Sequence, residues 1–125
     1  MKLLSQPQFQ KLKANGLAQD KVRGTPAELD LVPVVKLFNP YGAGTWLLTE
    51  ILPENDHWAF GLADLNCGCV ELGTIDLEEL SALRHPLGFK LIERDRHWEA
   101  TAPLSHYVKA SNEVNRIVDH LPAPA

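Results

Sequence analysis

The stretch Glu71–Asp95 reads ELGTIDLEELSALRHPLGFKLIERD, and the rest of the chain is arranged around it. It begins inside VELGTI (70–75), where apolar and polar residues suit a strand. Asp76 and Glu79 then have the spacing of a helix-capping box, in which an acidic side chain satisfies the first free backbone N–H groups. Leucines recur at helical spacing after this cap, so we predict a helix over 77–84.

A turn and a charged strand complete the stretch. Pro86 and Gly88 are typical turn residues and should end the helix. We predict a further strand over 89–98, with Leu91 inside and most of the charged side chains outside. We expect packing to account for the leucines of the Glu71–Asp95 stretch, but it does not account for the charged side chains that point outward.

Before the predicted helix over 77–84, the sequence predicts a meander of strands within residues 31–75. The segments LVPVVKLF (31–38), TWLLTEI (45–51) and WAFGLADL (58–65) are separated by short polar turns. Consecutive strands joined by short turns pair antiparallel. In 58–65, large side chains alternate with alanine and glycine. This pattern predicts that the face with the small residues lies under a helix or against a close backbone.

Helices are predicted at both ends of the chain. Residues 1–16 contain a capping box at Ser5, and Gly16 is expected to end the helix. Residues 105–121 have apolar side chains at a spacing of three to four, and Ser105 is the expected N-cap.

These elements indicate an α+β fold over residues 1–125 as a single domain. We expect a four- to five-stranded, mostly antiparallel meander sheet with the helices packed on one face. The chain has 125 residues, of which 45% are hydrophobic and 22% charged. This composition is ordinary for one globular domain.

Charge and cysteine content exclude several classes of function. The formal net charge of -4 argues against broad binding of a phosphate backbone, which requires a basic surface. Cys67 and Cys69 provide no disulfide framework, which favours a reducing compartment. No apolar run approaches the roughly 18 residues of a membrane span. We therefore expect a cytoplasmic protein with no membrane contact.

Two kinds of catalytic or metal site are disfavoured by their context. Cys67-Gly68-Cys69 could supply two zinc ligands, but none of the five histidines stands in a zinc-binding pair. The serines lack the surroundings of a nucleophile. We expect no cofactor and assign no catalytic residue.

Acidic residues near the strands leave an enzymatic alternative open. If they converged, they could bind magnesium for chemistry on nucleic acids or nucleotides. The residues in question are Asp64, Glu71, Glu93 and Asp95. The competing interpretation is a solvated face with ion pairs to Arg84, Arg94 and Arg96.

A second alternative is binding of single-stranded nucleic acid. Basic side chains beside an aromatic ring can follow and stack on a single strand. Such residues cluster near the end of the predicted fifth strand, at Lys90, Arg94, Arg96, His97 and Trp98. Neighbouring carboxylates weaken their field, so this alternative is not favoured.

Several motifs occur in a characteristic order: VVKLF (34–38), TWLLTE (45–50), FGLADL (60–65), ELG (71–73), DLEEL (76–80), Arg84, PLG (86–88), ERD (93–95) and PLS (103–105). This pattern resembles a family of small bacterial proteins catalogued as domain of unknown function 2958, over about Leu3 to Ala110. The resemblance implies a stand-alone cytoplasmic protein of plasmids, phages and integrative conjugative elements, encoded near genes for DNA processing or anti-restriction. It implies no activity and no catalytic residue.

The most consistent functional expectation is a non-enzymatic accessory protein of a bacterial mobile element. It would bind another protein, such as a component of host defence or of DNA processing. The candidate protein-binding residues are Glu71, Arg84, Glu93, Arg94 and Asp95.

Overall fold

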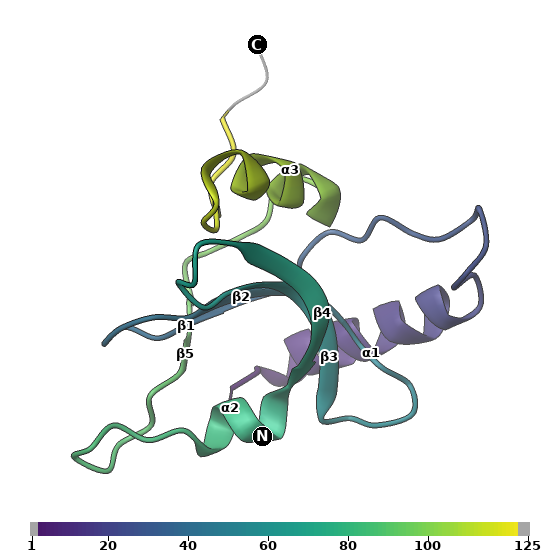
Figure 1. Ribbon diagram of the computed structural model, residues 1–125. Helices are drawn as coiled ribbons and strands as arrows, with labels where there is room; N and C mark the ends of the chain where they lie inside the picture. Colours follow the sequence, from purple (N-terminus) through teal and green to yellow (C-terminus); the bar gives the residue numbers. More distant parts are fainter. Residues whose placement is uncertain (1–2, 123–125) are drawn as a thin grey trace.

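The computed structural model describes residues 3–122 and contains one antiparallel sheet with three helices (Figure 1). The strands are β1 (Val35–Phe38), β2 (Thr45–Ile51), β3 (Trp58–Asp64), β4 (Val70–Asp76) and β5 (Glu93–Arg94). The helices are α1 (Gln6–Asp20), α2 (Leu77–Ala82) and α3 (Leu104–Val114). The predicted α+β fold with a meander sheet is confirmed.

The order of the strands in the sheet decides which elements lie at its edges. The order is β4-β3-β2-β1-β5, and all neighbouring strands are antiparallel. The first four strands follow one another as a meander, whereas β5 returns to pair with β1 through Leu37↔Arg94 and Phe38↔Glu93. The Glu71–Asp95 stretch therefore reaches from one edge of the sheet to the other.

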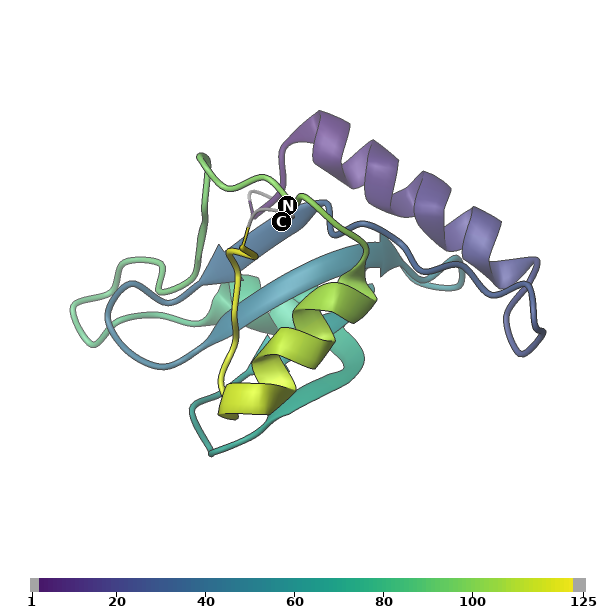
Figure 2. The same ribbon diagram turned by 90° about the horizontal axis from the view of Figure 1, so that it is seen from above.

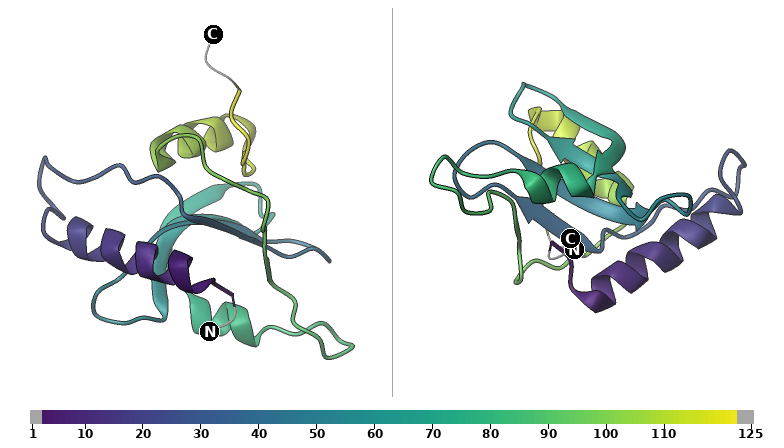
Figure 3. Two further views of the ribbon diagram at one scale, coloured as in Figure 1. Left: turned by 180° about the vertical axis from the view of Figure 1, so that it is seen from behind. Right: turned by 90° about the horizontal axis from the view of Figure 1, so that it is seen from below.

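The helices cover both faces of the sheet, which corrects the expectation that they share one face (Figures 1 and 3). On one face, Leu12 of α1 and Leu77 of α2 join a core with Leu48 and other strand residues. On the other face, Tyr107 of α3 packs in a second core with Leu47. The physical reason is that adjacent residues of β2 point to opposite faces, and both faces of this central strand are apolar.

Helix α1 has the predicted capping box, but its bounds differ from the prediction. The side chain of Ser5 accepts a hydrogen bond from Gln8 N, and the Gln8 side chain accepts one from Ser5 N, so the capping box is confirmed. The predicted helix 1–16 differs at both ends. Residues 1–2 lie outside the described part, residues 3–5 precede the helix, and the helix runs past Gly16 to Asp20. Gly16 is buried where α1 crosses the backbone of Ile51.

The segment from α2 to β5 is less regular than predicted. Asp76 caps α2 by accepting hydrogen bonds from two backbone N–H groups, as expected. The helix ends at Ala82 rather than at 84, because Leu83 has an extended backbone. The strand expected over 89–98 is reduced to Glu93–Arg94, where β1 offers only a short stretch of backbone.

Helix α3 is also shorter than the predicted 105–121. It starts at Leu104 and ends before Asn115, whose φ of 56° is left-handed. Ser105 is not the N-cap: Pro103 occupies that position, and Ser105 instead donates its backbone N–H and its hydroxyl to the carboxylate of Asp30. Over the residues described, no helix has the length and apolar character needed to cross a membrane.

Candidate functional site

The five residues expected to bind a partner do not lie on one surface. Glu71 belongs to β4, whereas Glu93 and Arg94 form β5 at the opposite edge of the sheet. Four strand spacings separate these edges, a distance of about 19 Å across the sheet. Arg84 lies on the β5 side, where it forms an isolated bridge with Lys90.

The four carboxylates considered for magnesium are scattered as well. Asp64 is buried and accepts hydrogen bonds from the backbone N–H groups of Asn66 and Ile117, both at 2.8 Å. Across residues 3–122, the structure contains no group of three or more His, Cys, Asp or Glu side chains placed to hold a metal ion. The convergence that the magnesium hypothesis requires is absent for Asp64, Glu71, Glu93 and Asp95, so that hypothesis is wrong for this set.

Asp95 belongs to an ion-pair network that stabilises the fold. Lys36 of β1 lies 3.3 Å from Asp95 and also pairs with Asp119, with the lysine side chain only 14% exposed. Burial lowers the pKa of Lys36, but hydrogen bonds and charge from Asp119 and Asp95 outweigh it and hold that pKa above its usual value. Burial raises the pKa of Asp119, but the hydrogen bond from Lys36 and further contacts outweigh it and leave the pKa lowered.

Trp98 is part of the same structural unit. Its indole N–H donates to the carbonyl of Asp119 at 2.7 Å, and its ring meets Tyr107 edge-on. The ring packs against the core under α3. Trp98 is therefore not presented for stacking on a nucleic-acid base.

Three other aromatic rings meet on the surface beside β5. The rings of His85 and Phe89 are stacked, with centroids 4.4 Å apart and planes 10° apart. Tyr41, from the turn between β1 and β2, contacts both of them. Leu87, at the tip of the same loop, is 81% exposed. Large apolar side chains at this exposure are typical of an interaction site when they gather in one place.

Basic residues neighbour two of these rings in the sequence, Arg84 beside His85 and Lys90 beside Phe89. In the described part of the chain, Arg84, Lys90, Arg94 and Arg96 form no ion pair within 4.0 Å. A concavity of about 180 Å³ is lined by Leu3, Lys90, Ile92, Glu93, Arg94 and Arg96. The ion pairs of Glu93 and Asp95 with the nearby arginines, which the competing interpretation predicted, are not observed among residues 3–122, although Glu93 lines the same concavity.

We call this region the aromatic–basic surface. It consists of Tyr41, Arg84, His85, Leu87, Phe89, Lys90, Glu93, Arg94 and Arg96. Sequence reasoning found its charged members but missed its rings. The expectation that packing accounts for the leucines of this stretch is wrong for Leu87, which is 81% exposed. Its place between Pro86 and Gly88 was the available signal, because a side chain at the tip of such a turn is difficult to bury.

The two cysteines lie in the turn between β3 and β4. Both are free and exposed, with their Sγ atoms 3.7 Å apart. They provide no metal site in the part of the fold that is described.

The chain belongs to the family described as "Protein of unknown function (DUF2958)", whose model matches residues 3–118. This match confirms the family indicated by the sequence motifs. No curated protein and no solved structure matches the chain.

Proposed function

We propose that this protein is a non-enzymatic accessory factor of a bacterial mobile genetic element that binds another protein through the aromatic–basic surface. The partner would be a component of host defence or of conjugative DNA processing. The observation that carries the binding proposal is the grouping of aromatic rings and an exposed leucine with cations that form no ion pair within residues 3–122.

Interfaces between proteins favour this composition. Aromatic residues and arginine are enriched in them, and a few such side chains carry most of the binding energy. The aromatic–basic surface offers Tyr41, Phe89 and Leu87 as apolar anchors and Arg84 and Arg94 as charged ones. The complementary partner is a protein surface that combines carboxylates with an apolar patch.

Single-stranded nucleic acid is the second candidate. The stacked pair of His85 and Phe89 beside Lys90 supports it, since bases stack on exposed rings next to cations. Two observations favour the protein partner instead. Trp98 is engaged with Asp119, and the chain carries a net charge of -4, which opposes attraction of a polyanion.

The mobile-element role and the placement in the cytoplasm are supported by observations other than the aromatic–basic surface. The mobile-element role follows from membership of the family and from the setting that its sequence pattern implies. Placement in the cytoplasm is supported by two cysteines that remain free thiols.

The test is affinity purification of the tagged protein from its native host, followed by mass spectrometry. Leu87→Asp should abolish recovery of the partner, and Arg94→Glu should reduce it by about tenfold or more, because hot-spot losses reach 2 kcal/mol. The matched control is Leu17→Asp, which introduces the same charge at a leucine of α1 that is 56% exposed.

Melting temperatures of all three variants should stay close to that of the unmodified protein, because the changed side chains lie on the surface. Equal recovery of the partner with Leu87→Asp and with Leu17→Asp would contradict the proposal. Titration with labelled single-stranded oligonucleotides at several salt concentrations tests the second candidate. Tight, salt-sensitive binding lost in Arg94→Glu would favour nucleic acid.

A further inference from the structure

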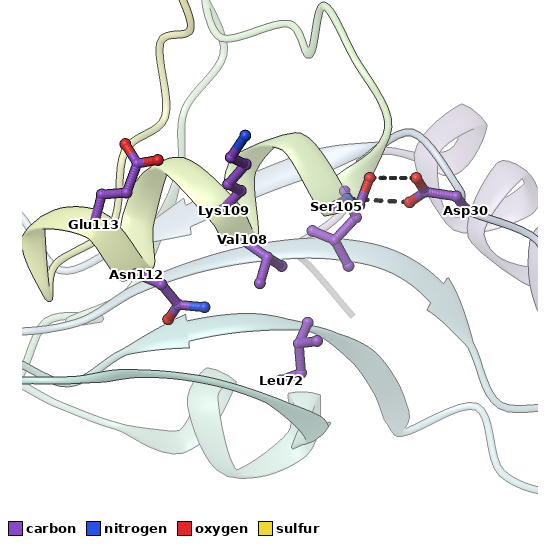
Figure 4. Close-up of a pocket in the computed structure, with 8 residues that line it drawn as sticks. Asp30, Leu72, Ser105, Val108, Lys109, Asn112 and Glu113 are labelled. Carbon is purple, nitrogen blue, oxygen red and sulfur yellow. Dashed lines mark hydrogen bonds between the residues drawn. The ribbon is translucent and has the colours of Figure 1, made fainter.

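A groove separates α3 from the edge strand β4, on the side of the molecule away from the aromatic–basic surface. The pocket in this groove has a volume of about 630 Å³ (Figure 4). Its apolar lining comes from Leu104 and Val108 of α3 and from Leu72 of β4. Leu72 and Val108 point toward one another across the opening (Figure 4), and Leu72 is still 49% exposed.

The backbone of β4 presents an unused row of hydrogen-bonding groups beside this pocket. Leu77 N donates to His57 O at 2.7 Å, so these two residues form a hydrogen-bonded pair of the β3–β4 ladder. Bonded and non-bonded pairs alternate in an antiparallel ladder. The register therefore directs the backbone groups of Gly73 toward β3 and those of Leu72 and Thr74 outward.

No strand covers that outer side within residues 3–122, because β4 is the last strand of the sheet. Figure 2 shows α3 lying over one face of the sheet, where it contacts β3 and β4. An edge of this kind is a template for an added strand. Recognition by strand addition combines backbone hydrogen bonds with pockets for alternate side chains.

Charges around the groove indicate what such a strand should carry. The exposed carboxylates of Asp30 and Glu113 lie at its lining, where Lys109 is the single cation. Glu71 is a further exposed carboxylate of β4, on the face of the strand opposite to Leu72. Acidic groups therefore outnumber basic ones, in contrast to the opposite edge of the sheet.

We propose that β4 and α3 form a second binding site, which takes an extended peptide segment of a partner protein. The peptide adds to the outer edge of β4 and places an apolar side chain between Leu72 and Val108. Basic residues two positions to either side share the face of this apolar residue and face the carboxylates of the groove. The row of backbone groups favours a peptide over a small apolar molecule, which would leave them unused.

The test uses a fluorescent peptide as long as the seven residues of β4, with a central valine, a lysine two positions to either side and threonine elsewhere. Fluorescence polarisation should show saturable binding to the unmodified protein. Two control peptides carry either N-methyl groups on the backbone or glutamate in place of lysine. Each should bind about tenfold more weakly or not at all, because one lacks hydrogen-bond donors and the other lacks the complementary charge.

Variants of the protein locate the site. Thr74→Pro removes an outward N–H group without touching the ladder to β3, and it should weaken binding of the lysine–valine peptide by about tenfold. Thr74→Val keeps that N–H group and should bind as the unmodified protein does. Leu72→Lys should abolish binding, whereas Val114→Lys changes an α3 residue of similar exposure (47%) outside the groove lining and should not.

Several outcomes would overturn the proposal. Binding of the N-methylated peptide as tight as that of its parent would mean that the pocket alone is used. Unchanged binding to Thr74→Pro, or no binding of any peptide at millimolar concentration, would exclude strand addition. A dimer in sedimentation that disappears in Thr74→Pro would identify a second copy of this chain as the occupant. Circular dichroism and melting temperature confirm that each variant is folded.

Discussion

Glu50 shows how burial and pairing compete at a single residue. Its side chain is 2% exposed and lies 3.0 Å from Arg23. Burial raises the pKa of Glu50, and the hydrogen bond and charge of Arg23 only partly oppose this. A carboxyl whose pKa is raised by folding stabilises the protein most below its unfolded pKa, and this contribution is lost as pH rises through the folded pKa.

We therefore expect Glu50→Gln to gain stability relative to the unmodified protein as pH rises from about 4 to 7. Urea unfolding at a series of pH values measures the difference in free energy. A difference that shrinks over this range would show that pairing with Arg23 outweighs burial.

Lys36 presents the opposite balance, because two carboxylates share it. Lys36→Met should cost roughly 1–2 kcal/mol at pH 7, less than for a fully buried pair, because Asp95 and Asp119 are 25% and 26% exposed. The pKa values of both carboxyls are lowered in the fold, so their contribution is present at neutral pH and is lost as pH falls below about 4. The cost of the substitution should therefore shrink at pH 3. A constant cost at both pH values would indicate lost packing alone.

At the scale of elements, the contact between α1 and β2 depends on Gly16. A Cβ atom placed there would lie 1.8 Å from the carbonyl oxygen of Ile51. Gly16→Ala should therefore destabilise the protein by about 1–3 kcal/mol, although alanine is the better helix former. Thermal unfolding measures this, and the control Ala18→Gly at an exposed position of α1 should cost about 1 kcal/mol from propensity alone. A stabilised Gly16→Ala variant would refute the close approach.

The start of α1 and the cap of α2 could be predicted because their signals are local. Ser5, Gln8 and Asp76 act on backbone groups within three residues of themselves. The end of α1 could not be predicted, because Gly16 is selected by a contact with β2 that is remote in sequence. The prediction of Ser105 as the N-cap failed for the same reason, because its hydroxyl donates a hydrogen bond to Asp30, which is remote in sequence.

A bulge in β2 also prevents a correct prediction of which residues share a face of this strand. Trp46, Leu48 and Glu50 would share one face of a regular strand. The register with β3 shifts between Leu48 and Glu50, and Ile51 rather than Glu50 joins the core with Trp46. Alternation in sequence cannot reveal such a shift.

At the scale of the whole molecule, Asp64 joins the sheet to the segment after α3. Its carboxylate accepts hydrogen bonds from Ile117 N and Asn66 N. Asp64→Asn replaces one acceptor oxygen by an NH₂ group and should cost about 1–3 kcal/mol, with faster hydrogen exchange at Ile117 than in α1. The control Asp56→Asn alters an exposed pair with Lys13 and should change stability by less than about 1 kcal/mol. Uniformly faster exchange throughout the protein would contradict a local role.

The placement of α3 was the main feature of the fold that pattern reading missed. Leu47 and Leu48 are adjacent and both fully buried, which requires cover on both faces of β2. The apolar sequence of β2 indicates that both faces of this strand need cover, but it does not indicate which helix covers each face. For the candidate site, the cations of 84–96 were found, whereas Tyr41 joins them through the tertiary fold.

The β3–β4 turn gives the protein a built-in attachment point for spectroscopic labels. Cys67 and Cys69 are the only thiols of the chain and are both exposed. The hydrogen bond between the two thiols, followed by the charge of Cys67, raises the pKa of the Cys69 thiol, so Cys69 reacts slowly with maleimides near neutral pH. One fluorophore on Cys67 would sit at the start of β4 and report a ligand arriving along that edge.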